Sequence, residues 1–189
     1  VIGGGMVAAE IASEISSLQS NISFAQSKAS LTDVRSEVSQ LDQQLSKLSQ
    51  TLEGARKQGY VYGGDIDPKL YDLMGQWQSA RPQAEEAISQ HAYSLSQSAA
   101  NLQGPLSQLA RYTNNAAQAR SLMPSASASV QGLIDAAQNA ESSIEAMYSN
   151  IRSEASAIET RLRPVAAMMA LMAGARFKLA EGESAVMAV

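Results

Sequence analysis

The sequence predicts an all-α protein, an elongated antiparallel bundle of about three long helices. Apolar residues recur at alternating three- and four-residue steps over three long stretches, the heptad spacing that places them on one face of a helix. The stretches have similar lengths, and a cluster of Gly, Asp and Pro separates the first from the second. Because helices joined by short connections pack antiparallel to their neighbours, we expect a single up-down-up bundle domain over residues 1–189.

The first helix is expected over about residues 6–57. Its apolar row slips in phase between Ile22 and Leu31, and we expect this slip to change the local supercoil without ending the helix. The residues of the row are Ile11, Ile15, Leu18, Ile22, Phe24, Leu31, Val34, Val38, Leu41, Leu45, Leu48 and Leu52.

The second helix is expected over about residues 68–122. Three glycines and a proline end the first helix within residues 58–68, and Asp67 with Pro68 forms a helix start, Asp as N-cap and Pro as first helical residue. The apolar register continues through Pro82 and Pro105, which favours kinks over true turns and leaves a split as the alternative. The row contains Leu70, Met74, Trp77, Arg81, Ala84, Ile88, His91, Leu95, Ser98, Leu102, Pro105, Leu109, Tyr112, Ala116, Ala119 and Met123.

The third helix is expected over about residues 125–180, after a short break at residues 122–125 that contains Pro124. Pro164 is expected to kink it. Its apolar row contains Val130, Ile134, Ala137, Glu141, Ile144, Tyr148, Ile151, Ala155, Ile158, Leu162, Val165, Met169, Met172, Arg176 and Leu179.

Charge and composition restrict the classes of partner. Only 17% of the residues are charged, against about 25% in an average chain, and the net charge is −4. The basic residues are scattered, which argues against nucleic-acid binding and against a polybasic membrane anchor. The absence of cysteine excludes disulfides and thiolate sites.

The compartment is indicated only weakly by the sequence. Low Lys content with abundant Ser and Gln slightly favours an extracytoplasmic or membrane-associated location over the cytoplasm. The chain begins at Val1, and its glycine-rich, apolar residues 1–9 fit the remnant of a signal peptide or membrane segment as well as a frayed terminus. No stretch reaches the ~20 apolar residues that a membrane span needs.

No catalytic, cofactor or metal motif is recognisable, so we expect a non-enzymatic protein without cofactors. His91 is the only histidine and lies in an apolar row, so a packed core histidine is favoured over a haem ligand or pH switch. Glu85 and Glu86 are off the Glu-x-x-His spacing of di-iron bundles. Asp65 and Asp67 lack the further oxygen ligands of a calcium loop, and capping explains Asp67 better.

Two segments are candidates for partner contact. Tyr60 and Tyr62 lie on the first break, where they either form a contact surface or fold over the end of the bundle core. The apolar stretch 165–175 contains Met168, Met169 and Met172 and is apolar on more than one face, which a helix with two neighbours does not need. It predicts either bundle core or an additional protein or lipid interface.

These observations favour a structural or interaction protein that self-associates or docks a protein partner. A ligand-sensing extracytoplasmic bundle tethered to a membrane is the alternative, motivated by the apolar residues at both ends of the sequence. A membrane-active protein that uses residues 165–175 at a membrane surface is the further alternative. The architecture is shared by several unrelated classes of helical protein and does not select among them.

Overall fold

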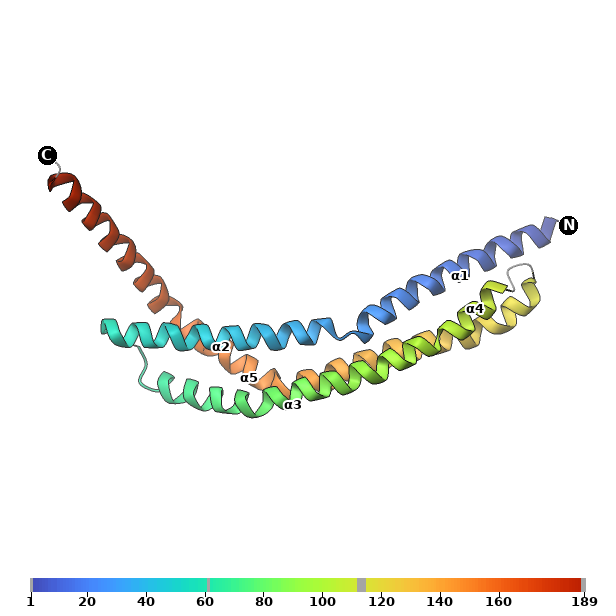
Figure 1. Cartoon of the computed structure of the whole chain (residues 1–189), viewed down its shortest axis with the longest axis horizontal. Coiled ribbons are helices and arrows are strands. Elements are labelled where there is room, and N and C mark those ends of the chain that lie inside the picture. Colours follow the sequence, from blue (N-terminus) through green and yellow to red (C-terminus); the bar gives the residue numbers. More distant parts are fainter. Residues whose placement is uncertain (1, 61, 112–114, 188–189) are drawn as a thin grey trace. The chain divides into compact units, whose positions relative to one another are not determined.

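The computed structural model describes the backbone of residues 2–60, 62–111 and 115–187, and the side chains within residues 9–175 except positions 61, 110, 112–114 and 116. The predicted all-α bundle is confirmed, since these residues are almost entirely helical and include no strand. The helices are α1 (Ile2–Ala29), α2 (Thr32–Gln58), α3 (Ile66–Asn101), α4 (Gln103–Arg111) and α5 (Ala116–Met187), which form three long helical stretches (Figure 1).

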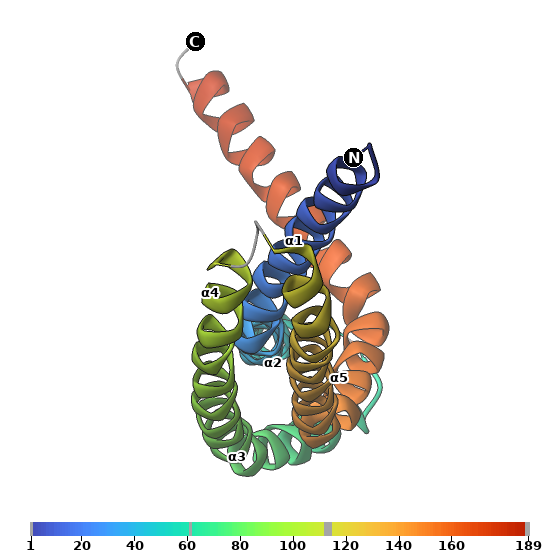
Figure 2. The ribbon, with the colours of Figure 1, turned by 90° about the vertical axis from the view of Figure 1, so that its right-hand side faces the viewer.

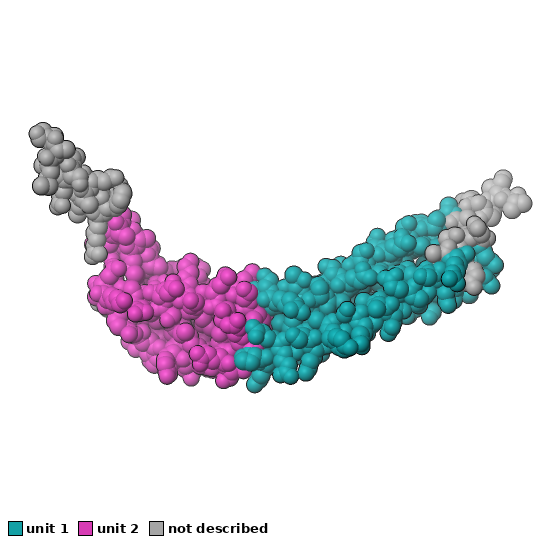
Figure 3. All heavy atoms as spheres, in the orientation of Figure 1, with its two compact units in different colours: residues 1–37, 82–147 teal, residues 38–81, 148–189 magenta. Residues whose placement is uncertain are grey.

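The chain folds into two compact units, and each of the three helical stretches contributes to both (Figure 3). Unit 1 contains residues 1–37 and 82–147, so it is built from α1, the first residues of α2, the second part of α3 with α4, and the first part of α5. Unit 2 contains residues 38–81 and 148–189, from α2, the first part of α3 and the rest of α5. Figure 2 looks onto unit 1 and shows α1 seated between α4 and the beginning of α5.

The core of unit 1 is made by the predicted apolar rows, with alanines at several contact positions. Ala25 and Ala137 are fully buried, which lets the helices approach closely. Phe24 was predicted to belong to this row and does not, because its neighbour Ala25 takes the core position and the Phe24 ring is 49% exposed. Other buried residues of unit 1 include Ile11, Leu18, Ile22, Ala84, Ile88, Leu95, Leu102, Leu109, Val130, Ile134 and Ile144.

The core of unit 2 is centred on an aromatic pair. The rings of Trp77 and Tyr148 meet edge to face, with centroids 6.4 Å apart and an interplanar angle of 85°. The indole Nε1 of Trp77 donates a hydrogen bond of 3.1 Å to Asp42 Oδ1, so the polar edge of the ring is satisfied. The surrounding buried residues include Leu41, Leu45, Leu48, Leu52, Ile66, Leu70, Leu73, Ile151, Ile158 and Leu162.

The phase slip in the first stretch ends the helix, contrary to the prediction. A continuous helix that buries Ala25 and Ala29 would next bring the polar positions 32, 33 and 36 towards the core. The interruption between α1 and α2 instead buries Leu31 and Val34 completely. Leu31 adopts φ 54°, a left-handed conformation that is uncommon for a residue other than glycine.

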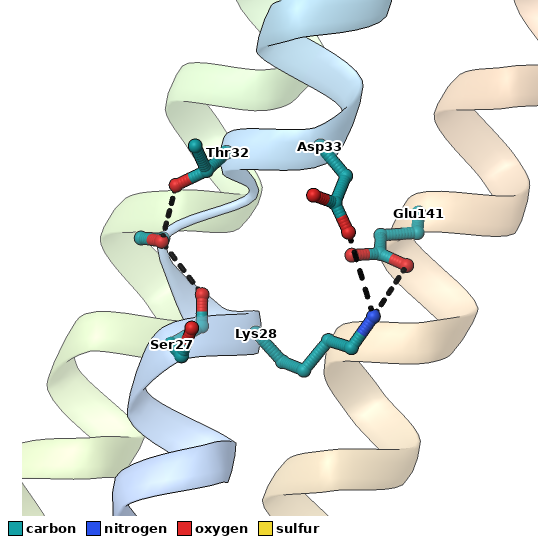
Figure 4. A network of polar contacts seen from close by, with 6 residues as sticks. Ser27, Lys28, Thr32, Asp33 and Glu141 are labelled. Atoms are coloured by element: carbon teal, nitrogen blue, oxygen red, sulfur yellow. Dashed lines mark hydrogen bonds and ion pairs between the residues drawn. The ribbon is translucent and has the colours of Figure 1, made fainter.

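Short polar contacts terminate α1 at this interruption (Figure 4). The Leu31 amide donates to the Lys28 carbonyl at 3.1 Å, and the Ser30 hydroxyl donates to the Ser27 carbonyl at 2.6 Å. These bonds satisfy carbonyls that the end of a helix leaves without partners. Across the interruption, Lys28 Nζ lies 3.6 Å from Asp33 Oδ2 and 3.7 Å from Glu141 Oε2 of α5.

The two prolines of the second stretch behave differently. α3 continues through Pro82, as the unbroken register predicted. The stretch is split near Pro105, however, because α3 ends at Asn101 and α4 begins at Gln103. Pro105 thereby falls in the first turn of α4, where its missing N–H is not needed for an intrahelical hydrogen bond.

The connection to the third stretch was predicted at residues 122–125, which is wrong. α4 ends at Arg111 and α5 begins at Ala116, so Pro124 and Pro164 both lie inside α5. The start of α5 is capped by Asn115, whose carbonyl accepts from the Ala119 amide at 3.0 Å. Asparagine is among the strongest N-cap residues, and the Asn115 side-chain Oδ1 accepts a hydrogen bond of 3.4 Å from the Gln118 amide.

Candidate interaction surfaces

The connection between α2 and α3 is a compact turn in unit 2. α2 ends on Gly59 with φ 74°, and the Tyr60 amide donates to the Ala55 carbonyl at 2.9 Å, which is a Schellman termination. The Asp65 carbonyl accepts the first bond of α3 from the Lys69 amide at 3.2 Å. Asp65 therefore occupies the N-cap position, two residues before the predicted Asp67.

Tyr60 and Tyr62 are both half-buried on this turn. The Tyr62 hydroxyl donates to Asp67 Oδ2 at 3.0 Å, and Asp67 Oδ1 accepts from Arg56 Nη2 at the same distance. Tyr62 thus links the turn to α3, and through Asp67 to α2, an arrangement that fits a bundle-end cap. A partner contact at Tyr60 and Tyr62 stays a prediction.

Asp65 joins the start of α3 to α5. Its two carboxylate oxygens accept from Arg161 Nη1 and Nη2 at 3.0 and 2.8 Å, and Lys69 Nζ lies 3.0 Å away. Hydrogen bonds from Arg161, and then from Lys69, hold the pKa of Asp65 well below its usual range. A Cβ on Gly63 would overlap the Arg161 guanidinium, so a larger residue at this position would make the end of the Arg161 side chain shift.

Replacing Asp65 with Asn is expected to remove part of the acid sensitivity of unfolding. Because the folded-state pKa of Asp65 is lowered from its ordinary value of 3.8, its ion pairs stabilise the protein above about pH 4. This contribution is lost as the pH falls further towards the folded-state pKa. Urea unfolding followed by circular dichroism between pH 7 and 2 should show a flatter pH dependence for Asp65→Asn. An unchanged slope below pH 4 would contradict the assignment.

Beyond Arg161, α5 presents large apolar side chains that are exposed in the described part of the chain. Met168, Leu171 and Met172 are 51%, 71% and 43% exposed, and we call these three residues the Met surface. These side chains are exposed because α3 begins only at Ile66, beside the Asp65–Arg161 pair. The turns of α5 that follow Arg161 therefore lack α3 as a neighbour.

Met169 has a different environment from the Met surface. It is half-buried, and a Cβ built on Gly54 of α2 would lie 2.9 Å from Met169 Cε. Among the predicted contact residues, the structure therefore brings Met168 and Met172 to an exposed face and packs Met169 on α2. Leu171 is a further exposed residue that was not predicted, because the prediction singled out the methionines of the apolar stretch 165–175.

His91 is half-buried on α3. Within the described residues, no group of three or more His, Cys, Asp or Glu side chains is arranged to hold a metal ion. No described helix is both long and apolar enough to cross a membrane.

Comparison with protein-family models, with curated protein sequences and with solved structures found no significant match to this chain.

Proposed function

We propose that this chain is a non-catalytic interaction protein that docks a helix of a partner protein on the Met surface. The observation that carries the proposal is the exposure of Met168, Leu171 and Met172 on a helix that continues past the start of α3. Earlier turns of α5 bury the residues of the same apolar row, among them Ile158 and Leu162. A partner helix would occupy the position that α3 holds along those earlier turns.

The composition of this part of α5 supports a protein partner over a lipid surface. Helices that lie in a membrane interface have one apolar face and one strongly charged or polar face. Positions 164–175 contain no charged residue, and the sides of the helix away from the Met surface present Ala166, Ala170 and Gly174. Small residues allow another helix to approach closely, and methionine side chains adapt to irregular partner surfaces.

Charge and size support a different protein over a second copy of this chain. Arg163 precedes the uncharged positions 164–175 and Arg176 follows them. Pairing this stretch with itself, parallel or antiparallel, would bring arginines together, and like charges across an interface are unfavourable. Three large exposed side chains are also few compared with the roughly 20–30 residues that each subunit contributes to a stable dimer, but they suffice for weak docking of a single helix.

The test uses a synthetic probe, a fluorescent three-heptad helical peptide with a leucine stripe and neutral Gln and Ser elsewhere. We expect the full chain to bind it with a Kd on the order of 10 μM, about −7 kcal/mol. The triple variant Met168→Ser, Leu171→Ser and Met172→Ser should weaken binding at least tenfold, since each side chain contributes about 1 kcal/mol or more when covered. Fluorescence anisotropy measures both values.

The matched control is a second triple variant, Tyr71→Ser, Tyr93→Ser and Met147→Ser, which removes exposed apolar side chains elsewhere. It should leave the affinity within about twofold. Equal loss in both variants, or no binding by the unmodified chain, would overturn the proposal. If light scattering shows a dimer that the Met-surface variant abolishes, self-association would replace helix docking as the function of this surface. If the chain floats with lipid vesicles and the same variant does not, membrane binding would replace it.

A further inference from the structure

A second surface in unit 2 lies between α2 and α5 and shares no residue with the Met surface. It is an open groove of about 550 Å³. Leu48 of α2 and Leu162 of α5 are its largest apolar lining residues, and both are almost fully buried with 4% and 2% exposure. Its edges are polar and include Lys47 on α2 and Arg163 on α5.

The two basic side chains of this groove, Lys47 and Arg163, are available for pairing with a ligand. Neither Lys47 nor Arg163 pairs with a carboxylate in the described part of the chain, whereas Arg161, two residues before Arg163, is held by Asp65. The carboxylate that lines the groove, Glu159, accepts a hydrogen bond of 2.7 Å from Gln44 Nε2. Lys47, Arg163 and Glu159 sum to a charge of +1, on a chain whose net charge is −4.

We propose that this groove binds an acidic peptide segment of a partner protein, with carboxylates paired to Lys47 and Arg163 and an apolar side chain on Leu48 and Leu162. Charge complementarity carries the choice of ligand, because the groove offers two unpaired cations from opposite walls above an apolar floor. Two cations neutralise too few phosphates for nucleic-acid binding. A membrane surface does not enter a groove between two helices.

The experiment compares two fluorescent peptides that differ only in charge, a Leu/Glu peptide and the same peptide with every Glu replaced by Gln. The full chain should bind the Glu peptide about tenfold more tightly at low salt, and this difference should shrink as the salt concentration rises. The double variant Lys47→Gln, Arg163→Gln should reduce the affinity for the Glu peptide about tenfold and leave the affinity for the Gln peptide unchanged.

The matched control is Lys57→Gln with Arg111→Gln, which makes the same change in net charge outside the groove. Lys57 forms an exposed pair with Glu53 that contributes little to stability. The control should bind the Glu peptide as the unmodified chain does. Equal affinity for the two peptides, or an equal loss in the control variant, would overturn the proposal. Because neither double variant alters the Met surface, this outcome is independent of the test of that surface.

Discussion

Replacing Trp77 with alanine is expected to lower the free energy of unfolding by about 3–5 kcal/mol. The indole is 4% exposed, packs edge to face on Tyr148 and donates a hydrogen bond to Asp42. Its removal leaves a cavity in the core of unit 2 and takes away the partner ring of a fully buried tyrosine. Urea unfolding followed by far-ultraviolet circular dichroism measures the change without relying on tryptophan fluorescence.

Tyr71→Ala is the control for this substitution. Tyr71 lies on the same helix and is also a large aromatic residue, but its side chain is 83% exposed. Its replacement should change the free energy of unfolding by no more than about 0.5 kcal/mol. If Trp77→Ala were as mild as Tyr71→Ala, Trp77 would not be a core residue and the packing of unit 2 described above would be wrong.

Leu31 should invert the usual order of alanine and glycine substitutions. Leu31→Ala removes a fully buried side chain and should cost about 3 kcal/mol. Leu31→Gly removes the same contacts, but it also removes the Cβ that makes φ 54° unfavourable, which is worth about 1 kcal/mol. The glycine variant should therefore be at least as stable as the alanine variant.

Leu45 provides the reference for a buried leucine inside a regular helix. It is 2% exposed on α2, so Leu45→Ala should also cost about 3 kcal/mol. At this position the glycine variant should be about 1 kcal/mol less stable than the alanine variant. The same order at Leu31 and Leu45, measured by chemical unfolding, would show that the left-handed conformation of Leu31 does not occur in solution.

The local features of the fold were mostly predictable because they depend on neighbouring residues. Leu41, Leu45, Leu48 and Leu52 recur at helical spacing and are all buried in unit 2. The turn after Gln58 was visible in its glycines, and Gly59 indeed supplies the positive φ that ends α2. Elsewhere the prediction overlooked a local signal: it placed the break at Pro124, whereas Asn115 caps the start of α5 and Pro124 lies inside that helix.

The candidate surfaces were less predictable. Met168 and Met172 were identified from the apolar excess of their stretch, but the sequence left open whether they form bundle core or an interface. Their exposure depends on where α3 begins beside Arg161, which is a relation between residues far apart in the chain. The groove with Lys47 and Arg163 was not found from the sequence, because scattered basic residues show no pattern until two helices place them together.

Apolar periodicity is a local property of the chain, so it was enough to predict the helical class of this protein and most of its buried residues. The packing of helices against one another determines what happens where the periodicity fails. At Leu31 the helix ends, because the break lets Leu31 and Val34 be completely buried where a continuous helix would bring polar residues towards the core. Helix packing also determines which apolar residues remain exposed, since a side chain is buried only where another helix extends far enough to reach it.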